Sequence, residues 1–256
     1  MCYDIKSQLE SQLKYAKRYT PELVPEILEK LAPYLDKLDH QHTSAFKQPN
    51  LLIYDDLKSA PQIAQWGLIP HWTKNELDAD KIWSKTINAR GEHIFDKPSF
   101  KLAAEKQRGI LVVDGFFEHK HVNKKAFPHF IQAESKETLN LGCLWDVWEN
   151  TQTNIKLKTF SIITTRATPF MEVIHNNPQL NEGRMPLILD DKNLSTWLSD
   201  VDSDKIKALI QPNKIKLKAH PVKAIRGKNI MTNNSNVTDE HYYHELNPPK
   251  TLFDDF

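Results

Sequence analysis

Apolar side chains recur at helical spacing near the start of the chain. In residues 5–19 they fall about four positions apart, at Ile5, Leu9, Leu13 and Ala16. This spacing predicts a helix with one apolar stripe. Thr20 and Pro21 are typical of an N-cap and a first-turn proline, so a second amphipathic helix is expected as far as Leu38. Residues 5–38 are therefore predicted to be a helical elaboration.

Beyond Ala45 the pattern changes to short apolar runs bounded by Pro, Gly and Asn. Such runs, rich in Ile, Val, Phe and Trp, are typical of β-strands. They lie at residues 50–54, 65–72, 109–113, 129–132, 139–145 and 159–165. Residues 191–211 have a helical apolar face again, and residues 214–220 alternate as a late strand. Residues 228–256 lack periodicity and are predicted to be loosely structured.

The order of these elements indicates the fold class. Strands and helices are mixed without the regular alternation of a doubly wound parallel sheet, so the chain is predicted to be α+β. No internal repeat and no linker rich in Pro, Gly or Ser interrupts the sequence. We therefore expect a single domain over residues 1–256.

The composition limits the classes of function. The chain contains 34 Lys and Arg against 33 Asp and Glu, a formal net charge of +1 over 256 residues. This excludes a polycation that binds nucleic acid through its overall field, so any such contact needs a local basic patch. Two cysteines without a CxxC or Cys/His spacing predict neither a disulfide scaffold nor structural zinc, and they favour a reducing cytoplasm.

Membrane, metal and nucleotide sites are not predicted either. No apolar run approaches the ~18 residues of a membrane span, and the first residues lack the apolar region of a signal peptide. No glycine-rich phosphate loop occurs, and the histidines do not have zinc-site spacings. The sequence thus predicts a cytoplasmic protein with no metal and no cofactor.

Cys2 is the most informative single residue. Aminopeptidases remove Met1 when the second side chain is small, so the mature chain is expected to begin with a cysteine that bears a free α-amine. That amine has a pKa of ~7.7 to 8, which leaves a useful unprotonated fraction at neutral pH. Because amine and thiol are on adjacent carbons, they can attack an aldehyde and close a thiazolidine ring. The alternative is a cysteine that stands at position 2 by chance.

Three further segments carry polar residues that a strand-rich core does not need. Asn88 and Arg90 are two apart on an extended segment and would point to the same face. Glu118 follows a strand-like run, where burial would raise its pKa toward the general-acid range; a turn glutamate paired with a lysine is the alternative. His175 ends an apolar helical stretch and Arg184 precedes a strand, and a surface or capping histidine is the alternative there.

These residues stand in a definite order along the chain. The motifs are Met1-Cys2, Trp66-Gly-Leu-Ile-Pro-His-Trp72, Ile87-Asn-Ala-Arg90, Asp114-Gly-Phe-Phe-Glu118, Thr164-Thr165, and His175 followed by Arg184-Met-Pro186. The ordered set resembles the SOS response-associated peptidase (SRAP) family, which includes abasic-site sensors that crosslink to damaged single-stranded DNA. The resemblance covers residues 1 to about 225. It implies an α+β domain around an antiparallel barrel-like sheet, with flanking helices and a positively charged cleft.

The resemblance also implies a role for each matching residue. The catalytic set comprises the nucleophile Cys2, Asn88 against the crosslinked sugar, the acid Glu118 and the active-site histidine His175. The DNA-binding set comprises Arg90 and Arg184 on phosphates, Trp72 and Pro49 in a wedge, and Thr164 in the cleft. For Trp72, packing in the core is the alternative to an exposed ledge on which a base stacks.

The chain departs from the family pattern at three places. Tyr3-Asp4 replaces a frequent Gly-Arg, which puts an acid where an arginine would contact DNA. His119 follows Glu118 where the family has tryptophan. Residues 176–183 separate His175 from the Arg-Met-Pro element, and the two are usually close in sequence.

Together the residues and the resemblance give one hypothesis for function. The protein would be a monomeric sensor of abasic sites in single-stranded DNA, acting in the DNA damage response. It would form a covalent thiazolidine crosslink through Cys2 after Met1 is removed, and would associate with the nucleoid when bound to DNA. One alternative is a cysteine-type (auto)peptidase or thiol hydrolase, and another is a non-catalytic single-stranded DNA-binding module. A lyase activity could accompany the crosslinking reaction.

Overall fold

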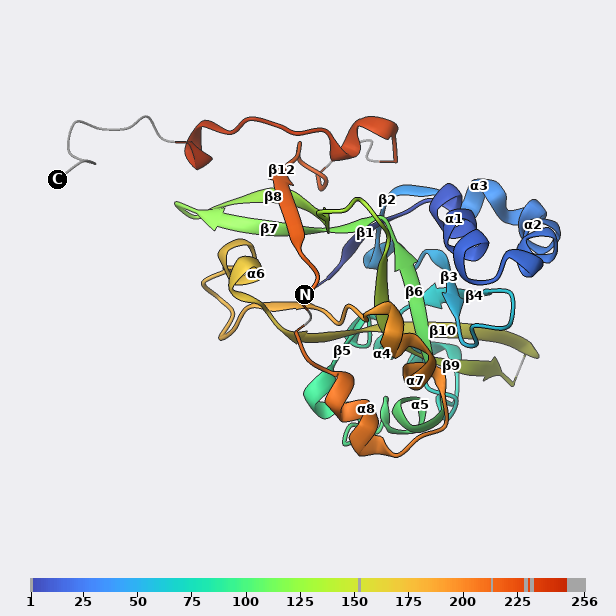
Figure 1. Ribbon diagram of the computed structural model, residues 1–256. Helices are drawn as coiled ribbons and strands as arrows, with labels where there is room; N and C mark the ends of the chain where they lie inside the picture. The colour runs from blue at the N-terminus through green and yellow to red at the C-terminus, as the bar shows by residue number, and fades with distance from the viewer. Residues whose placement is uncertain (1, 152, 213, 228–229, 231–232, 248–256) are drawn as a thin grey trace, which may run out of the picture.

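The computed structural model describes residues 2–151, 153–212, 214–227, 230 and 233–247. Its strands fall into two antiparallel-rich sheets (Figure 1). The first sheet has the order β12-β8-β7-β1-β2, with bounds Leu217–Pro221, Lys125–Ala133, Gly115–Val122, Asp4–Ser7 and His40–Ser44. The second has the order β11-β10-β4-β3-β6-β9, with bounds Arg184–Pro186, Ile155–Arg166, Gln62–Trp66, Asn50–Tyr54, Arg108–Val113 and Leu139–Asn150.

The second sheet closes on itself. β9 pairs with β10 antiparallel, from Asn150↔Ile155 to Cys143↔Ile162, and this pairing joins the two ends of the path β10-β4-β3-β6-β9. The short strand β5 (Asn88–Arg90) pairs parallel to β10 outside that path. Closure removes exposed strand edges, which is the physical advantage of a barrel. The α+β class and the barrel-like sheet predicted from the sequence are therefore confirmed.

The main core joins the two sheets. It includes Trp66, Leu111, Leu141 and Phe160 from the closed sheet, and Ile5, Phe116 and Ile131 from the first sheet. Every residue of β6 is buried, which explains why its sequence reads as an unbroken apolar run rather than an alternating one. Because one core serves both sheets, the chain forms a mixed α+β domain.

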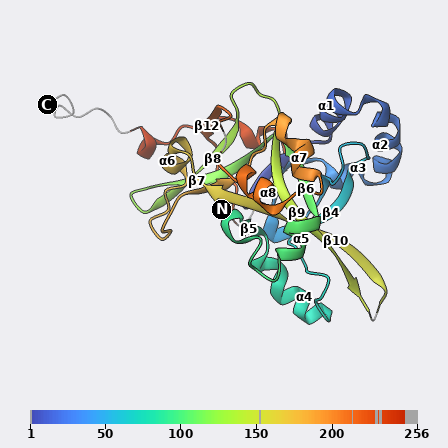
Figure 2. The same ribbon diagram turned by 60° about the horizontal axis from the view of Figure 1, so that its bottom comes forward.

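The helices lie around these sheets (Figures 1 and 2). Their bounds are Leu9–Tyr19 (α1), Val24–Leu31 (α2), Leu35–Leu38 (α3), Glu76–Ile82 (α4), Lys101–Lys106 (α5), Pro169–Ile174 (α6), Leu194–Leu198 (α7) and Ser203–Leu209 (α8). In Figure 1, α1–α3 group at one side of the molecule and α6 lies at the other. Ala16, Ile27, Leu31 and Leu52 form the small core that attaches α1 and α2 to the closed sheet.

The predicted N-terminal helices are correct in outline and wrong at two points. Residues Asp4–Ser7 form β1 rather than the first turn of a helix, because Ile5 is needed in the main core and pairs with Thr43 and Phe116. Thr20 does not cap the second helix with its side chain; the chain passes through a 3₁₀ turn at Pro21–Leu23 before α2 begins. The Thr20 hydroxyl instead donates to the Ala16 carbonyl at 3.4 Å.

Two later predictions also need correction. The expected strand at residues 65–72 is β4 at Gln62–Trp66, and it stops where Gly67 adopts φ +113°, a backbone conformation that suits glycine. The single helix expected over residues 191–211 is broken into α7 and α8 by residues 199–202. Asp202 caps α8 by accepting from the Asp204 backbone N–H at 2.8 Å, so a new helix starts there.

The late strand and the segment after it lie against the first sheet. β12 pairs with β8 from Leu217↔Ala133 to Pro221↔His129. Residues 233–247, expected to be loosely structured, contain 3₁₀ turns at Ser235–Thr238 and His244–Leu246, and the Tyr243 hydroxyl donates to the Val222 carbonyl. Residues 248–256 lie outside the described part of the chain. Among the helices described, none is long and apolar enough to cross a membrane.

Candidate active site

Cys2 is fully buried two residues before β1, and Asn88 reaches it from β5. The Asn88 side chain donates from Nδ2 to the Cys2 carbonyl oxygen at 2.9 Å. Burial, and then the nearby charge of Glu118, raise the pKa of the Cys2 thiol. The structure therefore brings three of the four predicted catalytic residues to one place, although they are 30 to 116 positions apart in sequence.

Glu118 and His175 face each other beside this point. Glu118 lies in β7, whose antiparallel pairing with β1 places Phe117 opposite Asp4, so the chain before β1 runs past Glu118. His175 follows the last residue of α6, and its Nε2 is 3.7 Å from Glu118 Oε2. That separation is longer than a direct hydrogen bond. Both side chains are almost completely buried.

Burial acts on both titratable groups in the direction that removes charge. It raises the pKa of Glu118 above its usual value, and it lowers the pKa of His175 to about 4. At neutral pH His175 is thus a neutral imidazole, and its contact with Glu118 is not a strong ion pair. The sequence could not predict this, because an unperturbed histidine has a pKa of ~6.5.

The protonated nitrogen of His175 is fixed by a backbone contact. The Arg184 N–H donates to His175 Nδ1 at 3.0 Å, so Nδ1 acts as the acceptor. In a neutral imidazole the proton then sits on Nε2, the atom that faces Glu118. Residues 176–183, the insertion that separates the two motif residues in sequence, therefore leave His175 and Arg184 in direct contact.

Asp4, the acid that replaces a family arginine, is buried and doubly paired. It accepts from His42 Nε2 at 3.0 Å and from Arg226 Nη2. Burial alone would raise the pKa of Asp4, but the hydrogen bonds and charges of His42 and Arg226 outweigh it and hold this pKa below its usual value. Arg226 also lies about 6 Å from the ring centres of Tyr3 and Phe46.

Glu118, His175 and Arg226 line a pocket of about 450 Å³. Its lining also includes Tyr3, His119 and His121. Arg226 was not predicted from the sequence, because it lies between the predicted elements and 222 positions from the acid that it pairs with. A volume of this size accommodates a small ligand or one sugar of a polymer.

The predicted phosphate-binding arginines differ in their surroundings. Arg90 has a side chain that is 55% exposed, and its nearest acid is Glu182, with Nη1 at 3.5 Å from Oε1. Arg90 and Asn88 line the same pocket of about 340 Å³ together with Lys85, His93 and Lys97. The prediction that Asn88 and Arg90 share one face is consistent with this, and the adjacent lysines add a local basic surface that the sequence analysis missed.

Arg184 is instead buried and held by acids. Its two terminal nitrogens donate to the two Glu92 carboxylate oxygens at 2.7 and 2.8 Å, and Nη1 also contacts Glu182. Nη2 donates to the Thr164 carbonyl at 2.8 Å. The hydroxyl of Thr164 is itself fully buried and donates to the Ala89 carbonyl at 3.5 Å. In this arrangement Arg184 links β11 to β10, and Thr164 links β10 to β5. Neither side chain points to the surface, where a phosphate could bind.

The two predicted wedge residues are also placed differently. Trp72 is 49% exposed, as an aromatic ledge requires, whereas Pro49 is buried next to β3 and its carbonyl accepts from the Trp66 N–H. The exposed aromatic residue near Pro49 is Phe46, which is 55% exposed and packs on Tyr3 with ring centres 5.2 Å apart. Phe46 is therefore a better candidate than Pro49 for contact with a base.

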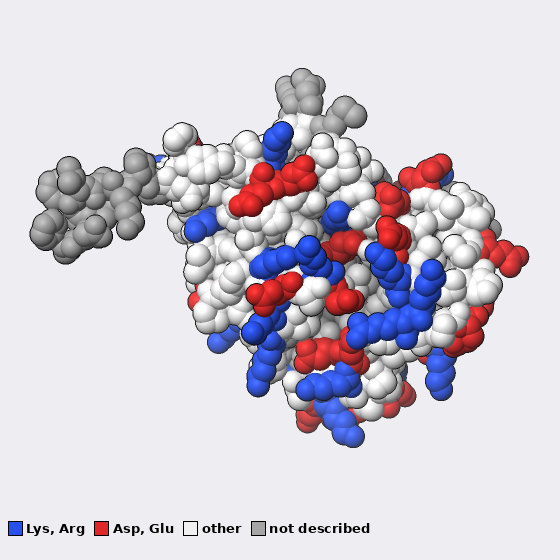
Figure 3. All heavy atoms as spheres, turned by 45° about the horizontal axis from the view of Figure 1, so that its top comes forward, with Lys and Arg blue, Asp and Glu red and all other residues white. Residues whose placement is uncertain are grey.

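Charge on the surface is local rather than global. On the face shown in Figure 3, Lys and Arg side chains gather around a hollow and are interleaved with Asp and Glu. Within the described residues, no group of three or more His, Cys, Asp or Glu side chains is arranged to hold a metal ion. Cys143, the second cysteine, packs in the main core beside Gly109 and is buried.

Comparison with known proteins gives consistent matches. The model of the SOS response associated peptidase (SRAP) family matches residues 11–228. Abasic site processing protein YoqW of Bacillus subtilis is 38% identical over 151 residues, which are 58% of this chain and 62% of that protein. Abasic site processing protein HMCES of Gallus gallus is 31% identical over 180 residues, 62% of this chain and 51% of that protein. The match thus spans less than two thirds of these relatives' length.

Solved structures show the same fold. A crystal structure of a Bacteroides thetaiotaomicron protein superposes with a TM-score of 0.79 at 28% identity, covering 94% of this chain and 100% of that one. A Bordetella bronchiseptica protein gives a TM-score of 0.70 at 19% identity, covering 87% of this chain and 100% of that one.

Proposed function

This chain belongs to the SOS response associated peptidase (SRAP) family, and from that membership we propose that it senses abasic sites in single-stranded DNA and captures them covalently through Cys2. The names of its Bacillus and vertebrate relatives support the abasic site as the substrate. The observation that carries the proposal is the arrangement of Cys2, held by Asn88, beside the buried Glu118–His175 pair. We also propose that it acts in the cytoplasm, on single strands exposed in the nucleoid, and that it does so as a single domain.

The reaction begins at the sugar. Hydrolytic removal of Met1, which lies outside the described residues, frees the α-amine of Cys2. Glu118, whose pKa is raised by burial, donates a proton to the ring oxygen of the closed hemiacetal. The bond between C1′ and the ring oxygen breaks as the C1′ hydroxyl releases its proton to solvent, and the ring opens to the C1′ aldehyde. The amine attacks C1′, and loss of water gives a Schiff base.

Ring closure follows at the same carbon. The Cys2 sulfur adds to C1′ while the thiol proton passes to the nitrogen, so a C–S bond forms and no oxidant or reductant is consumed. Asn88 fixes the backbone of Cys2 through its carbonyl, which keeps both nucleophiles next to one carbon. Such tethering makes the second attack effectively unimolecular. His175 lies beside Glu118 as a neutral imidazole, with Nε2 3.7 Å from Oε2, and so adds no positive charge that would favour the ionised carboxylate.

Contacts with the rest of the DNA are assigned by exposure and charge. Arg90, with Lys85 and Lys97, forms the basic surface suited to backbone phosphates. Trp72 and Phe46 are exposed aromatic residues suited to stacking on unpaired bases. Neither type of contact reads sequence, so the protein would accept any single strand that carries the lesion.

The thiol-hydrolase alternative receives less support. A cysteine hydrolase works through a thiolate, which needs a lowered pKa. Burial raises the pKa of the Cys2 thiol instead. A simple DNA-binding module would not need the buried Glu118 and His175 pair.

The proposal is tested with a single-stranded oligonucleotide that carries one abasic site. We expect the wild-type protein to form a heat-stable adduct on a denaturing gel, and Cys2→Ala to form none. Cys143→Ala is the matched control, because it removes the other buried cysteine and should retain the adduct. Equal adducts from all three proteins would exclude the proposal, as would an adduct with the same strand lacking the lesion.

A further inference from the structure

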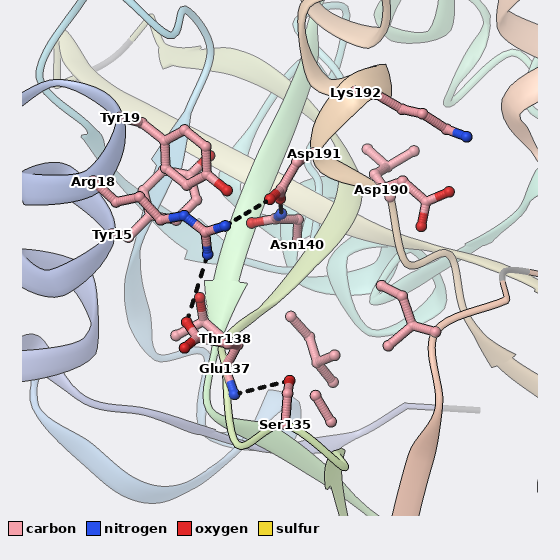
Figure 4. A pocket seen from close by; sticks show the side chains of 14 residues that line it. Tyr15, Arg18, Tyr19, Ser135, Glu137, Thr138, Asn140, Asp190, Asp191 and Lys192 are labelled. Atoms are coloured by element: carbon pink, nitrogen blue, oxygen red, sulfur yellow. Dashed lines mark hydrogen bonds and ion pairs between the residues drawn. The ribbon is translucent and has the colours of Figure 1, made fainter.

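A second pocket lies away from the reactive one and shares no lining residue with it. It has a volume of about 480 Å³ and lies between α1, the segment that leads into β9, and residues 189–192 (Figure 4). Its aromatic wall consists of Tyr15 and Tyr19 from α1, whose ring centres are 4.6 Å apart. The helical elaboration predicted from the sequence therefore supplies the aromatic wall of a cavity.

A buried acceptor in this pocket has no partner. Asn140 is 5% exposed, and its Nδ2 donates to Asp191 Oδ1 at 3.0 Å. Because a carboxylate only accepts, this contact fixes the amide orientation and turns Asn140 Oδ1 away from Asp191, as Figure 4 shows. Among the described residues Oδ1 has no hydrogen-bond partner, and the hydroxyl of Tyr15, also buried, has none either. Unpaired buried polar atoms are costly, so they mark a place for a ligand.

The charges in the pocket favour a cation. Glu137, Asp190 and Asp191 supply three carboxylates. Arg18 spans two of them at long distances, 3.6 Å to Glu137 and 3.5 Å to Asp191, and its side chain is 57% exposed. Within the described chain the Asp190 carboxylate has no ion pair or hydrogen bond, and the amine of Lys192 points away from the cavity (Figure 4).

The aromatic wall already holds one cation of the fitting kind. The Arg18 guanidinium lies 5.2 Å from the centre of the Tyr19 ring. Aromatic faces attract cations, and a planar guanidinium can stack on a ring while it donates to carboxylates at its edge. Burial and the hydrogen bond to Asp191 raise the pKa of Tyr19 to about 12, so the ring stays a neutral phenol.

We propose that this pocket binds a guanidinium group on an alkyl chain, stacked beside Tyr19 and donating to Asp190 and to Asn140 Oδ1. An arginine side chain of a partner protein and a free arginine-like molecule share this chemistry. The site would be separate from the reaction with DNA and independent of the proposed function.

The test uses two matched probes, N-acetyl-arginine N-methylamide and its citrulline counterpart, which has the same shape without the charge. Titration followed by NMR should give saturable shifts of the Asn140 side-chain amide with the arginine probe and binding about tenfold weaker with the citrulline probe. Equal binding of both probes, or no saturation by either at millimolar concentration, would overturn the proposal. Stronger binding of free arginine than of the blocked probe would identify a small molecule as the source, and the reverse would identify a polypeptide.

Two variants locate the site. Asp190→Asn removes the unpaired carboxylate without changing shape and should weaken the arginine probe about tenfold. Lys192→Ala is the matched control, since it removes a neighbouring charge that points away, and binding should not fall. Both variants should crosslink abasic-site DNA as wild type does, which separates this site from the reactive one. Unchanged binding in Asp190→Asn would rule out the assignment.

Discussion

Burial shifts the two titratable side chains at the centre of the candidate site in opposite directions. Glu118 keeps its proton to a higher pH than an exposed glutamate, and His175 stays neutral to a lower pH than an exposed histidine. The result is an acid beside a neutral donor rather than an ion pair. Because the two pKa values shift in opposite directions, we expect the reaction rate and the stability of the fold to depend on pH in different ways.

The first pH dependence is that of the reaction. We expect the rate of adduct formation to fall as pH rises through the raised pKa of Glu118, because the acid form is lost, and to fall at low pH as the α-amine is protonated. Glu118→Gln keeps the shape without the proton, so it should slow the reaction about a hundredfold and abolish the alkaline limb. Rates measured against pH by quenched gel assay provide the check. An unchanged alkaline limb in the variant would show that another group supplies the proton.

The second pH dependence is that of stability. Burial lowers the pKa of both His175 and His119 to about 4, so the unfolded chain binds more protons than the folded chain as pH falls below about 6.5. Stability should therefore be fully present above pH ~6.5 and be lost as pH falls toward 4. NMR titration of the two imidazoles should show midpoints near 4, and thermal unfolding should track them. A His175 midpoint near 6.5 would contradict the neutral assignment.

Arg226 gives a third prediction at the residue scale. Arg226→Ala should lower the free energy of unfolding by about 1 kcal/mol at neutral pH, because Asp4 stays buried and loses one of its two partners. The loss is this small because the Arg226 side chain is about half exposed and solvent screens its charge. The loss should shrink as pH falls below the usual pKa of Asp4 and disappear below the lowered pKa of Asp4 in the folded protein, where the carboxyl is protonated. Lys223→Ala, an exposed cation three positions earlier, is the control and should change little. Urea unfolding at two pH values measures both.

At the scale of elements, the hairpin that carries Glu118 is the most informative. β7 and β8 are joined at Asn123 and Lys124, which have φ of 49° and 64°. Two successive left-handed residues are the signature of a two-residue hairpin turn, and asparagine tolerates this conformation better than lysine. Lysine at the second position therefore stores strain at the end of β7, the strand that carries Glu118.

Lys124→Gly should relieve that strain and raise the free energy of unfolding by about 0.5 to 1 kcal/mol. Lys120→Gly, in the interior of β7, is the matched control and should lower it, since glycine costs backbone entropy in a regular strand. The midpoints of urea unfolding give the comparison. A destabilised Lys124→Gly variant would mean that the side chain contributes more than the backbone conformation costs.

The elements also show where sequence analysis succeeds. The runs at residues 50–54, 109–113 and 139–145 correspond to β3, β6 and β9, because strands buried on both faces are apolar throughout. Ile5 was misassigned because a spacing of four fits a helix stripe and also a strand followed by a helix. Tertiary pairing of β1 with β2 and β7 decides between them, and spacing within residues 5–19 does not contain that information.

The sequence likewise predicts one part of the candidate site and not the other: it names residues, but it does not give their charge states or their partners. Asn88, Glu118 and His175 are predicted as site residues because the ordered motifs contain them, and the fold places them near one another. The charge states of Glu118 and His175, and the pairing of Asp4 with Arg226, depend on burial and on contacts across the whole fold. Arg184 has the sequence position of a phosphate ligand, but Glu92 and Glu182 pair with it only in the folded chain. Long-range contacts of this type are what the sequence could not provide.

At the scale of the whole molecule, the near-zero net charge requires DNA affinity to come from a few cations, and this makes Arg90 and Arg184 distinguishable. For single strands, each neutralised phosphate contributes a slope of about −0.7 in the logarithm of affinity against the logarithm of salt. Arg90→Ala removes an exposed guanidinium, so it should reduce the slope by about 0.7 and leave stability nearly unchanged.

Arg184→Gln should instead lower the stability of the fold and leave the salt slope unchanged. It leaves Glu92 and Glu182 without their buried partner, so the free energy of unfolding should fall by about 2 kcal/mol or more. The loss is smaller than for a fully buried ion pair, because both acids are partly exposed and solvent screens their charge. The salt slope of the folded variant should equal that of wild type, because the guanidinium faces carboxylates rather than DNA. Fluorescence anisotropy on a labelled abasic-site strand at several salt concentrations, below the unfolding temperature of each variant, measures the slopes. A reduced slope for Arg184→Gln would show that this arginine leaves its acids to bind a phosphate, and would restore the role that its motif predicts.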